Sequence, residues 1–247
     1  MTADSTHDIE QLRAAGRVVR TAFEQMKAAA VPGVTTAELD AIAARYFFEC
    51  GARSAPQAMY NFPGATCISV NEEAAHGIPG PRRLEPGDMI NIDVSAQFNG
   101  YVADMGESFV LAPAAPERTR ISRAVRHAVN EALRRVRAGR SLNVIGHCVQ
   151  RVADRYGYRI IGNLASHGTG RTLHEEPSYV PLHNPRERRV LERGMVLTIE
   201  PFFTTDRDDV VETGDGWTLT CAPGELVAQF EQTLIVTDRA PIVVTAA

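Results

Sequence analysis

The segment HGTGRTLHEEP, residues 167–177, holds two histidines seven residues apart with two glycines between them. An imidazole can bind a transition metal, can exchange a proton near neutral pH, or can simply pack in a loop. The segment alone does not distinguish a metal site from a general acid–base pair or a structural loop. The distinction depends on whether carboxylates elsewhere in the chain can complete a site around these histidines.

Four carboxylates lie in stretches that otherwise predict buried strands. Asp93 is in NIDV, Asp104 in YVADMGESF, Glu200 in TIEP and Glu231 in QFEQTLIV. A buried ionised carboxylate costs several kcal/mol unless it is paired or bound to a metal, and no lysine or arginine adjoins any of the four in sequence. One such acid would usually face solvent or find a cation elsewhere in the fold. Four of them, together with His167 between glycine-containing segments, favour a metal site.

The residue types also suggest what a metal site would do. Carboxylate oxygens suit hard divalent cations, and imidazole suits transition metals. Four carboxylates and one histidine can hold two ions if some carboxylates bridge, and two bridged ions can share a hydroxide nucleophile. One histidine of the 167–177 segment would then be a ligand, and the other would face the substrate.

The first half of the chain predicts two helices followed by strands. Apolar residues recur at three- and four-residue spacing, which is typical of amphipathic helices, and β-branched apolar runs follow them. FNGY between the last two runs is typical of a hairpin turn. The predicted helices span 8–30 and 36–51, and the predicted strands span 66–70, 89–98 and 107–112.

The second half repeats this plan, with helices predicted over 116–139 and 141–157. Gly33 and Gly51 align with glycines 106 residues further on, and INIDVS is echoed by LTIEPF, which sets Asp93 against Glu200. Two amphipathic helix pairs can align by chance, but the glycines and acids keep nearly one offset, which favours an internal duplication.

We therefore expect an α/β (α+β) fold in one domain over residues 1–247. Its pseudo-repeats would span about 8–112 and 115–245, related by a pseudo-two-fold axis, with strands from both halves in one curved antiparallel sheet. The cleft between the halves is a natural place for a site. Residues 1–7 are expected to be a disordered tail.

Composition and charge exclude several other classes of protein. A net charge of −4 gives no electrostatic footprint for nucleic acid or an acidic membrane, and the basic stretch RRVRAGR is best explained as the solvated end of a helix. The four cysteines form no CxxC pair, which argues against a zinc ribbon or a thioredoxin-like site. The polar N-terminus does not resemble a signal peptide, and no apolar run approaches the ~20 residues of a membrane span. We expect a cytoplasmic protein with reduced thiols and no membrane partner.

Five motifs carry a resemblance to a known family. They are NEEAAHGIP at 71–79, NIDV with a second aspartate eleven residues later, HGTGRTLHEEP, TIEP, and DGWT followed by QFEQT. In this order and spacing the chain resembles the type I methionine aminopeptidases of peptidase family M24, which have the pita-bread fold. The resemblance covers residues 8–245.

The resemblance implies a role for each matching residue. The metal ligands would be Asp93, Asp104, His167, Glu200 and Glu231, with Asp104 and Glu231 bridging two divalent ions (manganese, iron, cobalt or zinc). Glu200 would also accept a proton from the bridging water, and His76 and His174 would contact the substrate and steady the developing oxyanion. The apolar pocket for a methionine side chain would be lined by Cys67, Trp217, Tyr60, Phe62 and Leu173.

The implied activity is removal of the N-terminal initiator methionine from nascent proteins and peptides that have a small second residue. The implied partners are peptide N-termini and, transiently, the ribosome, without nucleic-acid specificity, and the family is mostly monomeric. Ser166, Ala103 and Gln232 depart from the commonest bacterial pattern around the ligands, where they would tune metal affinity.

Two alternatives remain open at this stage. The stretch GYVAD is similar to proline-specific relatives, so an Xaa-Pro aminopeptidase or dipeptidase is the first alternative. Those relatives usually carry an additional N-terminal domain and lack HGIP. The second is a pita-bread protein that binds peptides without catalysis, but such relatives typically lose ligands, and all five are present here.

Overall fold

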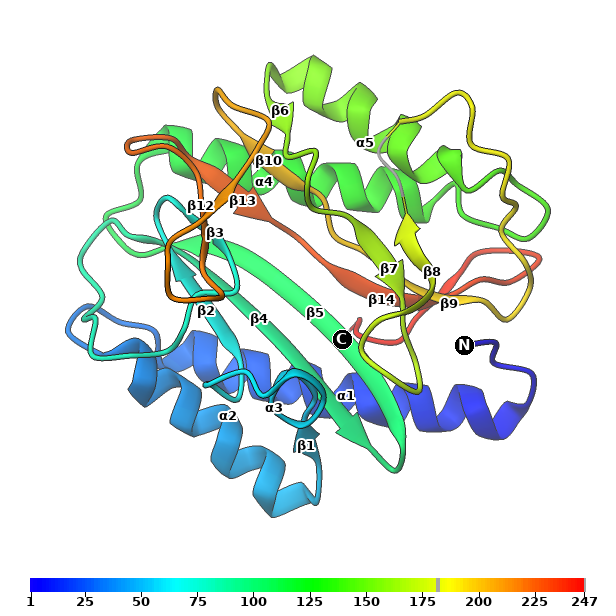
Figure 1. Ribbon diagram of the computed structural model, residues 1–247, viewed down its shortest axis with the longest axis horizontal. Helices are drawn as coiled ribbons and strands as arrows, with labels where there is room; N and C mark the ends of the chain where they lie inside the picture. The colour runs from blue at the N-terminus through cyan, green and yellow to red at the C-terminus, as the bar shows by residue number, and fades with distance from the viewer. Residues whose placement is uncertain (181–182, 247) are drawn as a thin grey trace.

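The computed structural model describes residues 1–180 and 183–246, and shows two helix pairs packed on central antiparallel strands (Figure 1). The first pair is α1 (Thr6–Ala29) and α2 (Thr36–Cys50), and the second is α4 (Pro116–Leu133) and α5 (Asn143–Tyr156). Capping boxes at Ser5 and Thr35 begin α1 and α2. Gly51 and Gly157 end α2 and α5 with φ of 74° and 75°, the left-handed conformation that glycine adopts without strain.

A long hairpin forms the centre of the first half. Strand β4 (Met89–Phe98) pairs with β5 (Tyr101–Val110) on one side and with β2 (Cys67–Val70) and β1 (Arg53–Ser54) on the other. Asn99 and Gly100 form the turn with φ of 51° and 77°. Two-residue hairpin turns need positive φ at both positions to match the right-handed twist of their strands. The sequence predicted this strand only from 107, because the small and acidic residues of YVADMG hide the alternation of apolar and polar side chains. In the structure the strand begins at Tyr101.

The second half is built from shorter strands. The five-stranded sheet has the order β15–β14–β9–β7–β8, and three-stranded sheets form beside it. A short helix, α3 (Ala55–Tyr60), lies before β2. The remaining strands are β3 (Glu73–Ala75), β6 (Arg159–Ile160), β7 (Ser166–Gly168), β8 (Glu175–Val180), β9 (Val196–Ile199), β10 (Phe202–Thr204), β11 (Val211–Glu212), β12 (Leu219–Thr220), β13 (Val227–Gln229), β14 (Gln232–Ile235) and β15 (Ile242–Val243).

The two halves meet along β5. The N–H of Glu231 donates to the carbonyl of Gly106 at 2.8 Å, and an antiparallel bridge joins Glu107 to Phe230. The buried Glu107 carboxylate also receives Lys27 from α1 and Arg126 from α4, so one acid ties together a helix from each half. The ladders of the two halves are therefore joined along this seam, in agreement with the predicted curved antiparallel arrangement.

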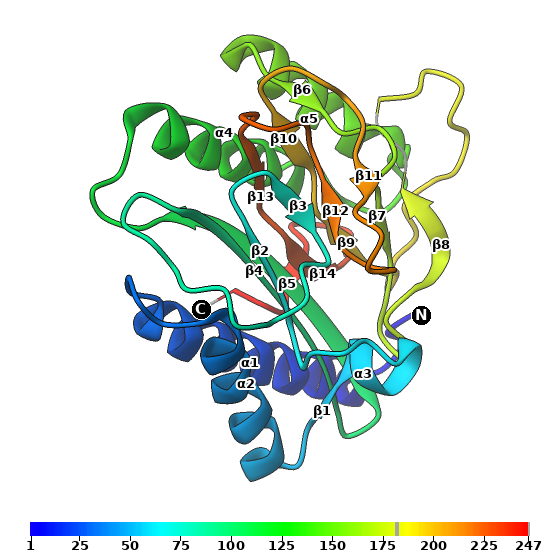
Figure 2. The same ribbon diagram turned by 60° about the vertical axis from the view of Figure 1, so that its left-hand side comes forward.

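Each half has its own apolar core between its helices and strands, and the two helix pairs form separate blocks against the strands (Figure 2). Gly33 and Gly139, aligned in the sequence, both have positive φ, of 95° and 81°. This agreement supports the proposed duplication and the proposal of one domain built from two repeats.

Two stretches differ from the sequence expectation. The helix predicted to Gly139 ends at Leu133, because the N–H groups of Ala138 and Gly139 donate instead to the carbonyls of Thr237 and Leu191. Residues 1–7, for which the sequence predicts a disordered tail, contact the rest of the chain. The N–H of Ala3 donates to the carbonyl of Gly194 at 2.7 Å, and α1 begins at Thr6.

Candidate metal centre and substrate pocket

The predicted acids and His167 converge between the two halves. Asp93 and Asp104 come from the β4–β5 hairpin, His167 from β7, and Glu200 and Glu231 from the ends of β9 and β13. Potential ligand atoms of Asp104, His167 and Glu231 lie within 4.8 Å of one another. His167 Nε2 is 3.2 Å from Glu200 Oε1 and 3.8 Å from Asp104 Oδ2.

The tautomer of His167 follows from its neighbours. Its Nδ1 is 2.9 Å from the carbonyl oxygen of Gly168, and a carbonyl oxygen can only accept, so Nδ1 carries the proton. Nε2 then presents a lone pair toward the acids, as a metal ligand must. The backbone N–H of His167 donates to Thr198 Oγ1 at 3.1 Å, which fixes the strand beneath the ring.

The carboxylates lack the partners that buried charges need. Asp104 and Glu231 are 5% and 1% exposed, and Asp104 Oδ1 and Glu231 Oε1 have no hydrogen-bond partner within the described part of the chain. Unpaired buried oxygens of this kind are costly unless a cation binds them. The donor set of carboxylates and one imidazole therefore fits divalent metal ions.

The pKa values of the acids reflect their burial close to one another. Burial first, and then repulsion from neighbouring carboxylates, raises the pKa of Glu200 to about 8 and holds those of Asp104 and Glu231 well above their usual range. Burial raises the pKa of Asp93 to about 6. Burial lowers the pKa of His167 to about 3, so this ring is neutral at physiological pH. Without a cation, several of these acids keep their protons at neutral pH.

We expect the stability of the metal-stripped protein to fall as pH rises from 6.5 to 8. An acid whose pKa is raised by folding keeps a proton that the unfolded chain has already lost. The pKa of Glu200, raised to about 8, places a loss of up to about 1.4 kcal/mol per pH unit in this window. The lowered pKa of His167 affects stability only below pH 6.5, where it makes stability rise with pH and so opposes this trend. Urea midpoints in chelator should show the decline, and added manganese should flatten it, because metal binding displaces protons. Metal-stripped protein that gained stability over this window would contradict the assignment.

Glu200 is held from two sides. Thr198 Oγ1 donates to Glu200 Oε1 at 2.6 Å, and the Glu200 N–H donates to Ser166 Oγ at 2.9 Å. Ser166 is one of the departures found in the sequence, and its hydroxyl anchors the backbone of a predicted ligand. Ala103 and Gln232, the other departures, are both buried, and Gln232 Oε1 accepts a bond from Thr245 Oγ1 at 2.9 Å.

A cavity of about 200 Å³ opens beside the acids. Its apolar wall includes Phe62 and Trp217, whose rings meet edge to face at 5.2 Å between centroids. The predicted pocket residues all line this cavity: Tyr60, Phe62, Cys67, His76, Leu173, His174 and Trp217. Asp93, Asp104, His167 and Glu200 line its inner end, so the cavity connects an apolar wall with the carboxylates.

The two remaining histidines stand at the cavity wall. The His174 ring lies against that of His167, with centroids 4.1 Å apart and a tilt of 51° between the rings, and its Nδ1 is 2.7 Å from the Tyr60 hydroxyl. His76 has a φ of 55°, an unusual left-handed conformation for a non-glycine residue that turns the chain after β3. Desolvation lowers the pKa of both His76 and His174, and His174 adds to the effect on His76. Both rings are therefore neutral near pH 7.

The residues that hold the acids in place could not be predicted from the sequence. Gln229, two residues before Glu231, bonds to Asp93 and Glu231, and Ser95 bonds to Asp104. Gln229 lies within the QFEQT region, where a buried glutamine in an apolar strand was the available signal. Ser95 carried no signal, because a serine in a strand is ordinary.

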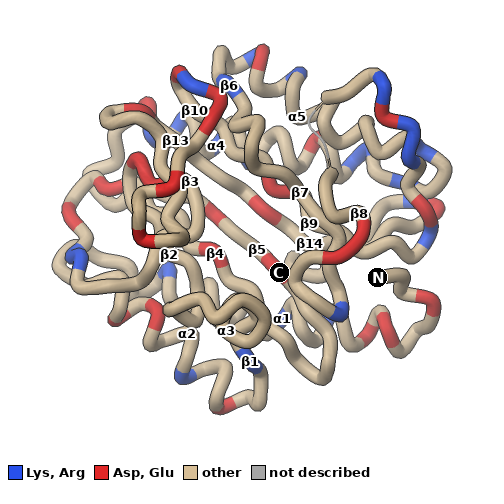
Figure 3. The backbone as a smooth tube through the Cα atoms, viewed as in Figure 1, with Lys and Arg blue, Asp and Glu red and all other residues tan. Residues whose placement is uncertain are grey.

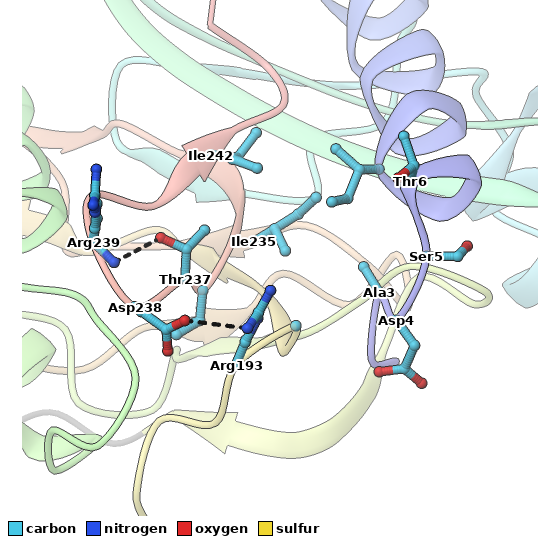
Figure 4. A pocket seen from close by; sticks show the side chains of 13 residues that line it. Ala3, Asp4, Ser5, Thr6, Arg193, Ile235, Thr237, Asp238, Arg239 and Ile242 are labelled. Carbon is cyan, nitrogen blue, oxygen red and sulfur yellow. Dashed lines mark hydrogen bonds and ion pairs between the residues drawn. The ribbon is translucent and has the colours of Figure 1, made fainter.

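A second hollow, of about 540 Å³, lies between the N-terminal segment and the strands β14 and β15 (Figure 4). It is crossed by the exposed Arg193–Asp238 ion pair, 3.3 Å between charged atoms. Its lining contains none of the predicted metal ligands and neither His76 nor His174. Its charged lining residues are exposed, so we assign it no role.

Comparison with known proteins places the chain among peptidases. The sequence model of metallopeptidase family M24 matches residues 10–238. Methionine aminopeptidase 2 of Bacillus subtilis is 40% identical over 247 residues, covering 99% of each chain. The crystal structure of methionine aminopeptidase from Thermotoga maritima superposes with a TM-score of 0.95 at 29% identity, with both chains fully covered. An X-Pro aminopeptidase from Thermotoga maritima shares the fold, with a TM-score of 0.79 at 20% identity, and this chain covers 62% of it.

Proposed function

The chain belongs to metallopeptidase family M24, and we infer from its site that it is a methionine aminopeptidase, a metallo-exopeptidase that removes N-terminal methionine. The observation that carries this conclusion is the cavity of about 200 Å³, apolar along one wall and bounded by carboxylates and His167 at its inner end. An apolar side chain can enter the wall side while the peptide bond that follows it lies against the acids.

We propose that Asp93, Asp104, His167, Glu200 and Glu231 would hold two divalent ions. Manganese, iron, cobalt and zinc all suit this donor set. When bound, such ions supply a nucleophile at neutral pH by lowering the pKa of water to about 7, and polarise the substrate. The buried oxygens of Asp104 and Glu231 that have no hydrogen-bond partner in the described residues support this assignment, because each could accept a cation.

The side chains around this centre have distinct tasks in the proposal. Glu200 accepts the proton of the attacking water, and its bond from Thr198 keeps the carboxylate in place. The Tyr60 phenol, whose pKa is raised by burial, stays protonated and donates to His174 Nδ1. His174 Nε2–H is then free to donate to the carbonyl oxygen as negative charge develops there. We propose that His76, which lines the same cavity, also contacts the substrate.

The pocket sets the substrate preference. Phe62, Trp217, Cys67 and Leu173 make an apolar wall suited to an unbranched thioether side chain. We propose that the second residue of the substrate lies beside Tyr60 and His174, where crowding would favour small side chains.

The test is amino-acid release by chelator-stripped protein to which manganese or cobalt is returned. Met-Ala-Ser, Met-Leu-Ser and Ala-Pro-Ala are offered in parallel. We expect metal-dependent methionine release from Met-Ala-Ser and little from Met-Leu-Ser. Cleavage confined to Ala-Pro-Ala would move the activity to the proline-specific branch, and no release with any metal from folded protein would favour a peptide-binding role.

We propose that the natural partners are N-termini of newly made chains, met by a cytoplasmic monomer that contacts the ribosome transiently. No helix in the described ranges is long and apolar enough to cross a membrane. Two loops support a ribosome contact. The N–H of Gly139 donates to the Leu191 carbonyl at 2.9 Å and that of Leu191 to the Arg140 carbonyl at 2.8 Å, so the segment after α4 pairs with the β8–β9 loop.

This pairing gathers exposed arginines that are far apart in the sequence. We call the exposed surface formed by Arg135, Arg137, Arg140, Arg186 and Arg188 the arginine edge. Figure 3 shows basic residues on the β8–β9 loop at the right-hand side, while acids mark the strands in the centre. The sequence explained RRVRAGR as a solvated helix end, and the structure adds the second basic segment. A basic surface on an otherwise acidic chain can attract an RNA backbone.

We expect the protein to cosediment with ribosomes at low salt and to dissociate at high salt, because phosphate contacts release counterions. The double substitution Arg137→Glu with Arg140→Glu should abolish cosedimentation without changing tripeptide hydrolysis. Arg45→Glu, on the exposed face of α2, is the matched control. Cosedimentation that survives the double substitution would place the contact elsewhere.

A further inference from the structure

The side chain of Gln229, at the end of β13, lies between two predicted metal ligands. Its Nε2 is 3.2 Å from Glu231 Oε2 and 3.5 Å from Asp93 Oδ2, and the residue is 1% exposed. An amide nitrogen carries two hydrogens, so it can donate one to each carboxylate. Asp93 belongs to the first half of the chain and Glu231 to the second. Gln229 therefore links the two halves at the site itself.

The orientation of this amide is fixed from behind. Asn91 Nδ2 donates to Gln229 Oε1 at 2.7 Å and to Ser108 Oγ at 3.2 Å, and the Gln229 N–H donates to the same Ser108 oxygen at 2.9 Å. Because Asn91 Nδ2 can only donate, Gln229 must turn its oxygen toward Asn91 and its NH₂ group toward the acids. Asn91 and Ser108 thus select the orientation in which Gln229 donates.

The space around the amide leaves little freedom. A Cβ at Gly106 would lie 2.2 Å from Gln229 Oε1, so the glycine in β5 makes room for this side chain. The Gly106 carbonyl also accepts the N–H of Glu231, and Gly106 is the register partner of Asp93. The Gly106 backbone and the Gln229 amide, buried side by side, therefore contact both ligands.

We propose that Gln229 is a positioning residue that sets the orientation of the Asp93 and Glu231 carboxylates, and thereby the affinity of the site for metal. By occupying Glu231 Oε2 it leaves Glu231 Oε1 for a cation, and that oxygen is the one without a hydrogen-bond partner in the described residues. A donor that already holds one oxygen of each carboxylate reduces the reorganisation that metal binding requires. This inference rests on the proposed metal centre.

The test compares metal affinity by titration calorimetry of chelator-stripped protein with manganese. Gln229→Met keeps the length and volume of the side chain and removes both donors. We expect the affinity to fall 10- to 100-fold, the range for losing a partner that orients a ligand. Gln150→Met is the matched control, because the Gln150 amide also donates to a carboxylate, that of Asp154 at 2.8 Å, but lies on α5 outside the site. Its affinity should stay within about two-fold of the unsubstituted chain.

Asn91→Asp gives a second, independent test in a residue that touches no ligand. An aspartate there accepts from the Gln229 NH₂ group, which turns the Gln229 oxygen toward the acids. We expect a similar loss of affinity, with turnover approaching the unsubstituted rate at saturating manganese in both variants. This variant decides the matter if Gln229→Met does not fold.

Affinities of Gln229→Met or Asn91→Asp equal to that of the Gln150→Met control would overturn the inference and leave the proposed function intact. A purely structural role would lower the unfolding midpoint without changing the affinity of the folded protein, and that result would also overturn it. Failure of the unsubstituted chain to bind any manganese would overturn the metal centre and this inference with it.

Discussion

The substitution His167→Ala is expected to remove metal binding and nearly all turnover while leaving the fold in place. His167 is the imidazole among the clustered ligand atoms, and its tautomer is set so that Nε2 faces Asp104 and Glu200. Losing a partner that only orients a ligand already costs 10- to 100-fold, so loss of a ligand should exceed about 100-fold in affinity. Calorimetric titration and methionine release from Met-Ala-Ser measure the two effects.

The control is His147→Ala, an exposed histidine on α5. It should leave metal affinity and turnover unchanged. Removing the imidazole of His167 also removes the ring against which His174 lies, so circular dichroism must show that the variant is folded. A folded His167→Ala protein with the metal content and rate of the unsubstituted chain would show that His167 is not a ligand.

The sequence predicted the elements of this fold better than their extents. The helices ending at Gly51 and Gly157 were readable because amphipathic spacing and a left-handed glycine agree at each end. The helix after Pro116 ended early because its continuation bonds to Thr237 and Leu191, which lie about 100 and 50 residues further along the chain. No local pattern can signal that competition between helix bonds and bonds from distant segments.

The candidate site divides in the same way. Asp93 and Glu200 were visible because an acid inside an apolar strand contradicts its surroundings, and such contradictions often mark function. The residues that orient the acids gave little contrast. Asn91, Ser108 and Gln229 form one network whose members are 17 and 138 residues apart in sequence, and only the seam between the halves brings them together. The arginine edge was hidden for the same reason, because its two segments pair only in the folded chain.

The substitution His174→Ala should keep both the fold and the metal while losing most of the rate. His174 lies at the cavity wall, bonded to Tyr60 and outside the cluster of ligand atoms formed by Asp104, His167 and Glu231. In the proposed mechanism its Nε2–H donates to the carbonyl oxygen only as charge develops. Removing one such donor typically lowers kcat about 10²- to 10³-fold with little change in KM.

Metal affinity separates this outcome from that of His167→Ala. His174→Ala should titrate with manganese as the unsubstituted chain does, and methionine release at saturating Met-Ala-Ser should fall. Tyr60→Phe keeps the ring against His174 and removes only the hydroxyl, so its loss of kcat should be smaller, in proportion to the poorer orientation of the imidazole. A fully active His174→Ala protein would exclude the oxyanion role. A variant that lost its metal as well would instead make His174 part of the metal centre, because its ring lies against His167.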